Sequence, residues 1–379
     1  MEPVTVGLDI GTTSIKAVAV DGTGRVIERI RIPHKVVIPA PNLMEHDAER
    51  AWRRGPKRAL AALAHLKPAA VAVASMIPSM TAVDRRGRPL TPGLLYGDGR
   101  AFSDEAAPAH EPGEIPTSGA EVEGFLKWSA SNAPAAHAFW PAQAVANYAL
   151  GGRPAIDFAV AFTASPLFGA DGWDAEICAR CGVEPGQLPP VELPGGAAGH
   201  VGGSDDGPIL TAGTVDVWCE QLVSGATEPG DVHIICGTTL IIWAVASESG
   251  ETPHPSVWTV PHSVPGLRMV GGASNAGGLF LEWANRLAGK GEEEVDPAHV
   301  PVWTPYPRGE RTPYHDPRRR AALHDLDLTH GPGAIRRAAW EASGFVVRHH
   351  LELGRIQARR IIATGGGTKV AGWMQAIAD

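Results

Sequence analysis

A Gly-Thr-Thr triplet occurs twice in this chain of 379 residues, each time between two apolar segments. Gly11-Thr12-Thr13 follows residues 4–10, and Gly237-Thr238-Thr239 follows residues 233–236. This pattern predicts a buried strand, a tight turn and a second apolar strand. Glycine beside hydroxyl residues in a tight turn leaves backbone N–H groups open to a phosphate. We therefore expect two similar half-molecules that grip one polyphosphate from opposite sides.

The first copy of the triplet carries an acid that the second lacks. Asp9 stands at the end of the first strand, directly before the turn. A carboxylate beside bound phosphates can hold Mg²⁺, usually through water, so we expect Asp9 to be a metal ligand. The alternative is an aspartate that caps the turn. Lys16, on the following strand, faces either the phosphates or solvent.

Length and charge limit the classes of protein that fit. A chain of this length exceeds one comfortable core, which predicts two domains, over 1–228 and 229–379. The net charge of −8 argues against nucleic acid or an anionic membrane as the main partner. No apolar run reaches the roughly 18 residues of a membrane span. No secretory signal is visible, and Cys178-x-x-Cys181 reads as small hydrophobic residues, so we expect a cytoplasmic protein.

Strands and helices alternate along the chain, which predicts an α/β fold. In the second half, a strand over 267–270 leads through Gly271-Gly272-Ala273-Ser274 to a helix over 279–287. A long helix over 334–353 precedes a strand over 360–363. The glycine triplet 365–367 and a final helix follow. Strands that should flank this last unit are missing from the sequence. We therefore expect an exposed sheet edge in the second domain, with low stability, weak binding of the polyphosphate ligand or a homodimer as the result.

Asp216 follows an apolar strand and precedes a segment that reads as helix, residues 217–223. This places Asp216 at a helix N-terminus and at the carboxyl end of a strand, where α/β proteins bind ligands. There it either accepts a proton from a substrate hydroxyl or caps the helix.

Three further segments carry polar or glycine residues in loops. Asp98 and Arg100 can both reach a polyol, or they pair with each other at the surface. Residues 308–313 hold the acid–base pair Glu310-Arg311 between glycine and proline, which predicts a loop of fixed shape; the alternative is a solvated loop. Gly366 and Gly367 follow a strand and can pass close to an adenine or a ribose.

Taken together, these motifs resemble the FGGY family of carbohydrate kinases, in its xylulokinase-like branch. The resemblance extends along the whole chain and rests on the order and spacing of the motifs. It implies an actin/hexokinase-like (ribonuclease H-like) fold of two α/β domains with an ATP cleft between them. It also implies ATP and Mg²⁺ as cofactors, a sugar or polyol as substrate, Asp216 as the general base and Asp9 as the carboxylate associated with Mg²⁺.

The resemblance assigns roles to smaller residues as well. It implies phosphate or nucleoside contacts for Gly11, Thr12, Thr13, Lys16, Gly237, Thr238, Thr239, Gly272, Gly366 and Gly367. Asp98, Arg100 and Asp216 fall on the sugar side. Ile77 takes the place of a polar sugar contact, because Met76-Ile77-Pro78 stands where xylulokinases have Gln-Met-His, and Val217 replaces the usual Asn or Gln after the base. Hydrogen bonds discriminate hydroxyl-rich substrates, so the identity of the sugar stays open.

Two other functions fit part of the pattern. An actin- or Hsp70-like ATPase has both phosphate turns but no need for Asp98, Arg100, Glu310 and Arg311. A catalytically impaired relative that senses sugar or nucleotide fits Ile77, Val217 and the short second domain. Fold analogy alone does not decide among them. Sugar-dependent ADP release, compared with hydrolysis in the absence of sugar, separates the three.

Overall fold

The computed structural model describes residues 3–40, 43–102, 119–262, 264, 266–290, 295–307, 309–316 and 318–379. Within them the chain forms two compact units, the first ending at Glu220 and the second beginning at Gln221. The division falls inside helix α6 (Asp216–Ser224), and residues 228 and 229 lie between this helix and the next strand. Each unit has its own sheet.

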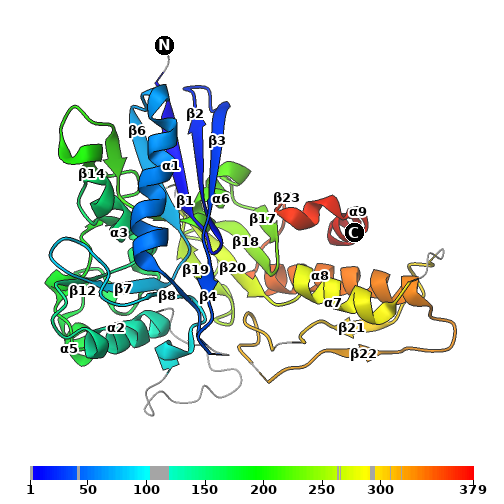
Figure 1. Cartoon of the computed structure of the whole chain (residues 1–379). Helices are drawn as coiled ribbons and strands as arrows, with labels where there is room; N and C mark the ends of the chain where they lie inside the picture. Colours follow the sequence, from blue (N-terminus) through cyan, green and yellow to red (C-terminus); the bar gives the residue numbers. More distant parts are fainter. Residues whose placement is uncertain are drawn as a thin grey trace. The chain divides into compact units, whose positions relative to one another are not determined.

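The main sheet of the first unit is a mixed sheet of seven strands (Figure 1). Strands β1, β2 and β3 form an antiparallel meander, whereas β6 pairs in parallel with β1, β15 and β16. The strands in spatial order are β14 (Ala197–His200), β15 (Ile209–Thr211), β6 (Ala70–Ser75), β1 (Thr5–Ile10), β2 (Ser14–Val20) and β3 (Val26–Pro33), with β16 (Thr214–Val215) also on β6.

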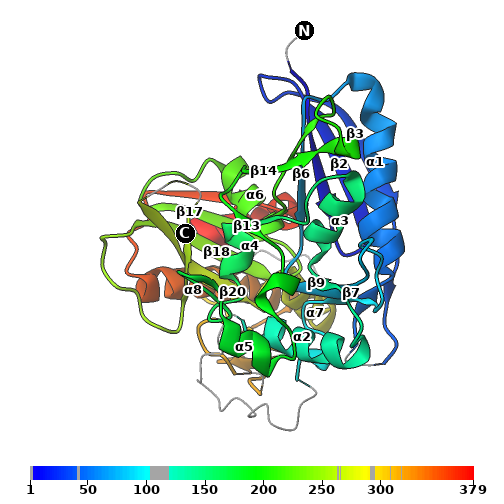
Figure 2. The same ribbon diagram turned by 90° about the vertical axis from the view of Figure 1, so that its left-hand side faces the viewer.

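Two helices pack side by side on this sheet, α1 (Gly55–Leu63) and α3 (Ala142–Leu150), as Figure 2 shows. Alternate residues of β1 are buried because one face of the strand meets the core. Helix α1 begins with glycine at a close approach to the sheet, since a Cβ at Gly55 would lie 2.8 Å from the side chain of Ile15. Edge strand β3 alternates between half-buried and exposed residues.

A second sheet of the first unit is built from five short strands. Helix α2 (Ala120–Asn132) packs against one of them, β7. The strands in order are β4 (Val36–Val37), β5 (Glu45–His46), β8 (Gly93–Leu95), β7 (Ser79–Val83) and β9 (Ala138–Trp140). This sheet holds His46 and leads from β8 into residues 96–100.

The cysteine pair of the first unit lies at α5 (Ala175–Arg180). Cys178 and Cys181 are free and buried, and burial raises the pKa of the Cys181 thiol to about 11. Both thiols therefore stay protonated and pack as small hydrophobic groups, as the sequence predicted.

The second unit has a five-stranded sheet whose central strands are β17 (Asp231–Cys236) and β18 (Leu240–Ser247). The order continues outward through β20 (Leu267–Ser274) to β19 (Trp258–Pro261) on one side and to β23 (Arg360–Thr364) on the other. The sequence predicted that strand β20 ends at residue 270, but residues 271–274 extend it. Gly271 lets the strand continue, because a Cβ at this position would clash with the carbonyl oxygen of Ile242.

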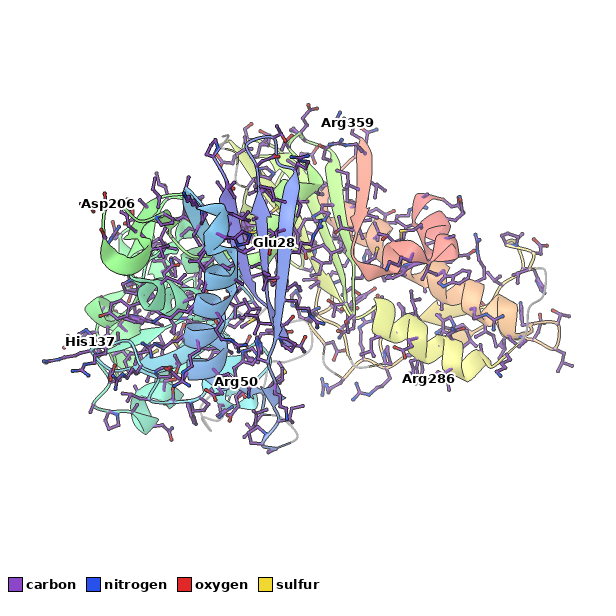
Figure 3. The ribbon with its side chains drawn as sticks, turned by 45° about the horizontal axis from the view of Figure 1, so that its top comes forward. Glu28, Arg50, His137, Asp206, Arg286 and Arg359 are labelled. Carbon is purple, nitrogen blue, oxygen red and sulfur yellow. The ribbon has the colours of Figure 1, made fainter. Side chains whose placement is uncertain are left out.

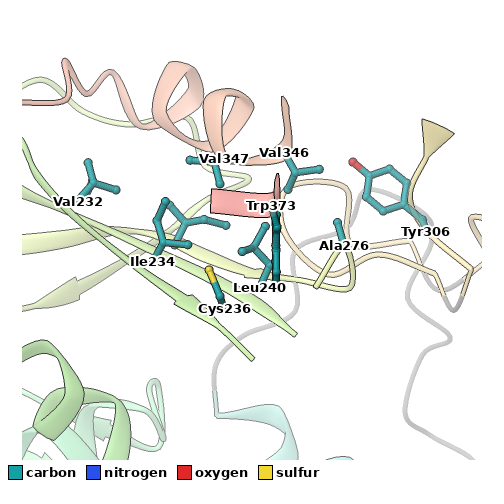
Figure 4. Packing of buried hydrophobic residues seen from close by; sticks show 11 residues of the cluster. Val232, Ile234, Cys236, Leu240, Ala276, Tyr306, Val346, Val347 and Trp373 are labelled. Carbon is teal, nitrogen blue, oxygen red and sulfur yellow. The ribbon is translucent and has the colours of Figure 1, made fainter. Parts of the chain in front are cut away.

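Helices α8 (Pro332–Gly354) and α9 (Ala371–Ala378) complete the core of this unit. Helical spacing brings Ala338, Ala342 and Val346 of α8 onto one buried face. Figure 4 shows the side chain of Trp373, from α9, among Leu240 and other buried residues. Its indole N–H donates to Ser343 Oγ at 2.9 Å, so the buried polar group is satisfied. None of the described helices is both long and apolar enough to cross a membrane.

Strand β23 forms one edge of the second sheet in the described part of the chain, and Ile361 on it is 40% exposed. Because an open strand edge with apolar side chains invites pairing, we expect two copies of the chain to associate through it. The substitution Ile361→Lys should then shift the mass measured by light scattering from dimer to monomer. Ile27→Lys, on edge strand β3 of the first unit, is the matched control and should leave the mass unchanged. A monomeric unsubstituted chain would contradict the expectation.

Candidate active site

The first Gly-Thr-Thr turn joins β1 to β2 with Asp9 and Lys16 directly opposite each other. Lys16 Nζ lies 3.0 Å from Asp9 Oδ2, and the lysine side chain is 63% exposed. The Gly11 N–H donates to the carbonyl of Ser14 at 3.1 Å and closes the turn. A Cβ at Gly11 would lie 3.6 Å from Asp9 Oδ2, so glycine keeps the space beside this carboxylate free.

Two histidines hold the carbonyl groups of this turn. His34 Nε2 donates to Gly11 O at 2.9 Å, and the His34 backbone N–H donates to Thr13 O at 3.0 Å. His46 Nε2 donates to Thr12 O at 2.8 Å. The N–H groups of Thr12 and Thr13 have no acceptor among the residues that the structure describes. The turn therefore keeps its carbonyls bound and its amide donors available to an anion.

The proton positions of this histidine pair follow from their partners. Trp52 Nε1 donates to His46 Nδ1 at 3.0 Å, which leaves the His46 proton on Nε2, toward the turn. Burial lowers the pKa of His46 to about 4 and also lowers the pKa of His34. Both rings are therefore neutral near pH 7. No motif in the sequence marks His34, His46 or Trp52 as part of the site.

We expect His46→Phe to raise the KM for ATP about tenfold and to change kcat little, because the turn loses one buried hydrogen bond. His46→Gln, whose amide N–H can reach the same carbonyl, should restore most of the affinity. Steady-state kinetics at saturating sugar measures both constants, and the melting temperature reports any loss of folding. An unchanged KM for ATP in a folded His46→Phe variant would show that the turn does not need this anchor.

Asp216 lies at the same edge of the main sheet as Asp9. Strands β1 and β16 flank β6, and Ala74 of β6 is in register with Asp9 on one side and Thr214 on the other. Since neighbouring strands are about 4.8 Å apart, β1 and β16 run roughly 10 Å from each other. Asp216 is the first residue of α6, which confirms the predicted helix N-terminus. Its Oδ1 accepts the Val217 N–H at 2.8 Å.

The environment of Asp216 suits a proton acceptor. Burial raises the pKa of this carboxyl, and the negative charge of Asp9 raises it further. The Val217 N–H and the Lys16 ammonium act in the opposite direction. A carboxylate with a raised pKa is a stronger base than an ordinary surface aspartate. Asp9 therefore lies close enough for its charge to act on the Asp216 carboxyl.

The Asp98–Arg100 pair is present, and it is buried, whereas the alternative interpretation placed it at the surface. Asp98 Oδ1 accepts from Arg100 Nε at 2.8 Å, and Oδ2 accepts from Arg100 Nη2 at 2.7 Å and from the Met44 N–H at 2.5 Å. Arg100 also pairs with Glu45 at 2.7 Å and lies over the Trp128 ring. Burial acts to raise the pKa of Asp98, but the hydrogen bonds from Arg100 hold it below its usual value. The pair thus fixes the segment after β8, and its contact with sugar stays a prediction.

The segment around this pair also contacts the phosphate turn, because the Tyr96 hydroxyl lies 3.2 Å from Thr12 Oγ1. Ile77 follows β6 and lines a narrow apolar cavity together with Leu126, Ile156 and Trp173. The wall that Ile77 forms is therefore apolar where the resemblance places a polar sugar contact.

The second Gly-Thr-Thr turn joins β17 to β18 in the second unit. The N-terminus of α7 (Gly278–Ala288) holds its carbonyls, since the N–H groups of Gly278 and Leu279 donate to Gly237 O at 2.8 Å and Thr238 O at 3.1 Å. Cys236 pairs directly with Leu240, so three residues form this loop, whereas four separate Ile10 from Ile15 in the first. In both turns the carbonyl groups are held by hydrogen bonds, but the second loop is one residue shorter than the first.

Glu310 ties two distant segments of the second unit together, so the loop has the fixed shape that the sequence predicted. It is 3% exposed and accepts from Ser274 Oγ at 2.7 Å and from the Asn275 N–H at 3.1 Å. Two residues later, Thr312 Oγ1 donates to Ala273 O at 3.1 Å. The Thr312 side chain covers Gly272 so closely that a Cβ on the glycine would overlap it. Arg308 lies outside the described residues.

Burial raises the pKa of Glu310 to about 7 from 4.5. The folded state therefore holds this proton more tightly than the unfolded state, and stability should fall as pH rises from about 4.5 to 7 and then level off. The loss is at most about 3 kcal/mol for this shift. Glu310→Gln should lack this fall, which urea unfolding at a series of pH values measures. Parallel pH profiles for the two proteins would contradict the assignment.

The glycine triplet packs on the end of β17. Gly365 has φ of 90°, and a Cβ there would lie 2.7 Å from Cys236 O. A Cβ on Gly367 would overlap the Trp373 ring, whereas one on Gly366 would meet no atom within 4 Å. Gly365 and Gly367 thus allow close packing, whereas the space beside the Cα of Gly366 is empty. Nucleoside contacts of Gly366, Gly367 and Gly272 stay predictions.

The fold is a two-domain α/β fold of the actin/hexokinase-like class. Residues 4–107 match the model of the N-terminal domain of the FGGY family of carbohydrate kinases, and residues 232–379 match its C-terminal domain. The chain belongs to the FGGY family of carbohydrate kinases. The predicted family, fold class and enzyme class are confirmed: the protein is a phosphotransferase that acts on a sugar hydroxyl.

Individual relatives agree with this assignment. A xylulose kinase of Streptomyces rubiginosus is 27% identical over 402 residues, which cover 99% of this chain and 82% of the relative. The crystal structure of a xylulose kinase from Rhodospirillum rubrum matches with a TM-score of 0.83 at 26% identity, covering 99% of this chain and 84% of that one. The crystal structure of a gluconate kinase from Lactobacillus acidophilus has the same fold, with a TM-score of 0.84 at 19% identity. The match covers 100% of this chain and 84% of that one.

Proposed function

We propose that this kinase transfers the γ-phosphoryl group of ATP to a hydroxyl of a xylulose-like sugar, with Asp216 as the general base. The observation that carries the proposal is the shared sheet edge in the first unit, where Asp216 and Asp9 flank β6 beside the phosphate turn. Family membership supports ATP-dependent phosphorylation of a sugar. The xylulose kinases among the relatives favour a ketopentose as substrate.

Asp216 would accept the proton of the sugar hydroxyl while the oxygen of that hydroxyl attacks the γ-phosphorus. The bond from the γ-phosphorus to the bridging oxygen breaks, and ADP leaves with the electron pair. Because the transition state of phosphoryl transfer is loose, the proton moves late and a carboxylate is a strong enough base. The burial of Asp216 and the charge of Asp9 raise its pKa in the direction that this role requires.

The residues around the turn fit a phosphate and a magnesium ion. The N–H groups of Thr12 and Thr13, which have no acceptor within the described part of the chain, suit phosphate oxygens, and Lys16 supplies a positive charge. The Asp9 carboxylate is a hard oxygen ligand of the type that Mg²⁺ prefers, and Gly11 keeps one side of it open. Bound Mg²⁺ would neutralise phosphate charge during transfer. That the turn at Gly237, Thr238 and Thr239 holds the same nucleotide stays a prediction.

The sugar itself is tested by a panel of ketoses, aldonates and polyols, with ADP release as the readout. We expect turnover with a ketopentose and little hydrolysis without sugar. Because Ile77 and Val217 are apolar, we expect turnover to depend less on the sugar hydroxyls that these two positions would contact. ATP hydrolysis that no sugar stimulates would favour the actin- or Hsp70-like ATPase. Saturable sugar or nucleotide binding without turnover would favour the impaired sensor.

A further inference from the structure

Two histidines and an aspartate of the second unit lie together and belong to none of the motifs discussed so far. His299 belongs to the loop before β21 (Val302–Thr304), and Asp327 and His330 belong to the turn between β22 (Ala322–His324) and α8. One nitrogen of each histidine and one carboxylate oxygen lie within 4.8 Å of one another. The cluster thus brings three metal-ligating groups from two separate segments to one point.

The spacing of these groups suits a metal ion. His299 Nε2 is 3.8 Å from Asp327 Oδ2, and His330 Nδ1 is 3.3 Å from Asp327 Oδ1. Ligands bound tetrahedrally at 2.0–2.1 Å are roughly 3.4 Å apart, so small adjustments bring the groups onto one ion. The two imidazole rings stack with their centroids 4.6 Å apart, so the two histidines already lie against each other.

His330 is the buried histidine of the cluster, and one of its ring nitrogens has no partner among the described residues. Its side chain is 3% exposed, and its Nε2 is buried without a partner among the described residues. Its Nδ1 accepts the Asp327 N–H at 3.0 Å, so the Nε2 proton has no acceptor. A metal bound at His330 Nδ1, the nitrogen beside Asp327, would replace the hydrogen bond from the Asp327 N–H. The side chains of His299 and Asp327 are about half exposed, which leaves room for water as a further ligand.

We propose that His299, Asp327 and His330 bind one divalent transition-metal ion of the Zn²⁺ type. Imidazole nitrogens favour zinc, nickel and copper, whereas Mg²⁺ prefers oxygen ligands, so this ion differs from the one used with ATP. The bound ion joins the loop before β21 to the turn before α8. Its role is therefore to stabilise the second unit.

The test is a titration of the metal-free full chain with Zn²⁺ in excess Mg²⁺, followed by calorimetry and by the melting temperature. We expect saturable binding of one ion per chain and a higher melting temperature with zinc. His299→Ala and Asp327→Asn change exposed residues, so both variants should fold. Each should weaken zinc binding at least about tenfold and abolish the thermal shift.

His324→Ala is the matched control, because His324 is an exposed histidine of the same unit outside the cluster. It should bind zinc as the unsubstituted chain does. The proposal is overturned if the unsubstituted chain shows no saturable zinc binding in excess Mg²⁺. It is equally overturned if His299→Ala and Asp327→Asn bind zinc with unchanged affinity and stoichiometry.

Discussion

Asp216→Asn should lower kcat by ~10²–10⁴-fold and leave ATP binding largely intact, because removing a positioned general base has an effect of this size. The amide has nearly the same shape and can still accept the Val217 N–H, so the start of α6 should persist. Kinetics with the best substrate of the sugar panel gives kcat, and calorimetry with a non-hydrolysable ATP analogue gives nucleotide affinity.

The pH profile adds a second readout for Asp216. Its pKa is raised in the folded protein, so the activity of the unsubstituted enzyme should fall with acid through a pKa above that of an ordinary aspartate. Glu176→Gln, an exposed acid on α5, is the control and should keep full activity. Near-native turnover of Asp216→Asn would show that another group, or water alone, takes the proton.

Asp9→Asn is the second substitution with a large expected effect. It should lower kcat/KM by about 10²-fold and raise the Mg²⁺ concentration needed for half-maximal rate, since a charge that holds the metal is lost. The same change should shift the acidic limb of the pH profile to lower pH, because the negative charge of Asp9 raises the pKa of Asp216. Kinetics across pH and Mg²⁺ concentration measures all three effects.

The direction of that pH shift distinguishes this arrangement from a merely structural role for Asp9. A misfolded turn would lower the rate at every pH. Loss of the Asp9 charge should instead shift the acidic limb of the pH profile to lower pH. Asp206, an exposed acid of the same unit (Figure 3), offers the control substitution Asp206→Asn. If the acidic limb of the pH profile is unchanged in Asp9→Asn, the charge of Asp9 does not act on Asp216. That result would contradict the site as described.

The sequence predicted the elements that short-range pattern controls. The strands around both turns, the helix start at Asp216 and the long helix that became α8 all follow from apolar periodicity and local polar residues. Gly271 shows the limit of that approach. A glycine pair reads as a turn locally, but here it continues β20, because the strand comes too close to β18 for a side chain.

The parts of the site that the sequence did not reveal depend on contacts between distant segments. His34, His46 and Trp52 meet the first turn only after the small sheet folds beside it, and no spacing in the chain marks them. His46 lies in a strand of only two residues, Glu45 and His46, which is too short to give a periodic pattern in the sequence. Asp98 and Arg100 were recognised as a pair, but their burial depends on Met44 and Glu45, more than fifty positions earlier.

The histidine pair behind the first turn has a thermodynamic consequence for ATP binding. The carbonyls of Gly11, Thr12 and Thr13 are fixed during folding, so the entropy of ordering the turn is already lost before nucleotide arrives. Binding to these donors should then show little unfavourable entropy from loop ordering. The affinity for phosphate should therefore depend on how firmly the core around Trp52 holds the turn. Substitutions that loosen this core should increase the entropic cost of binding before they unfold the protein.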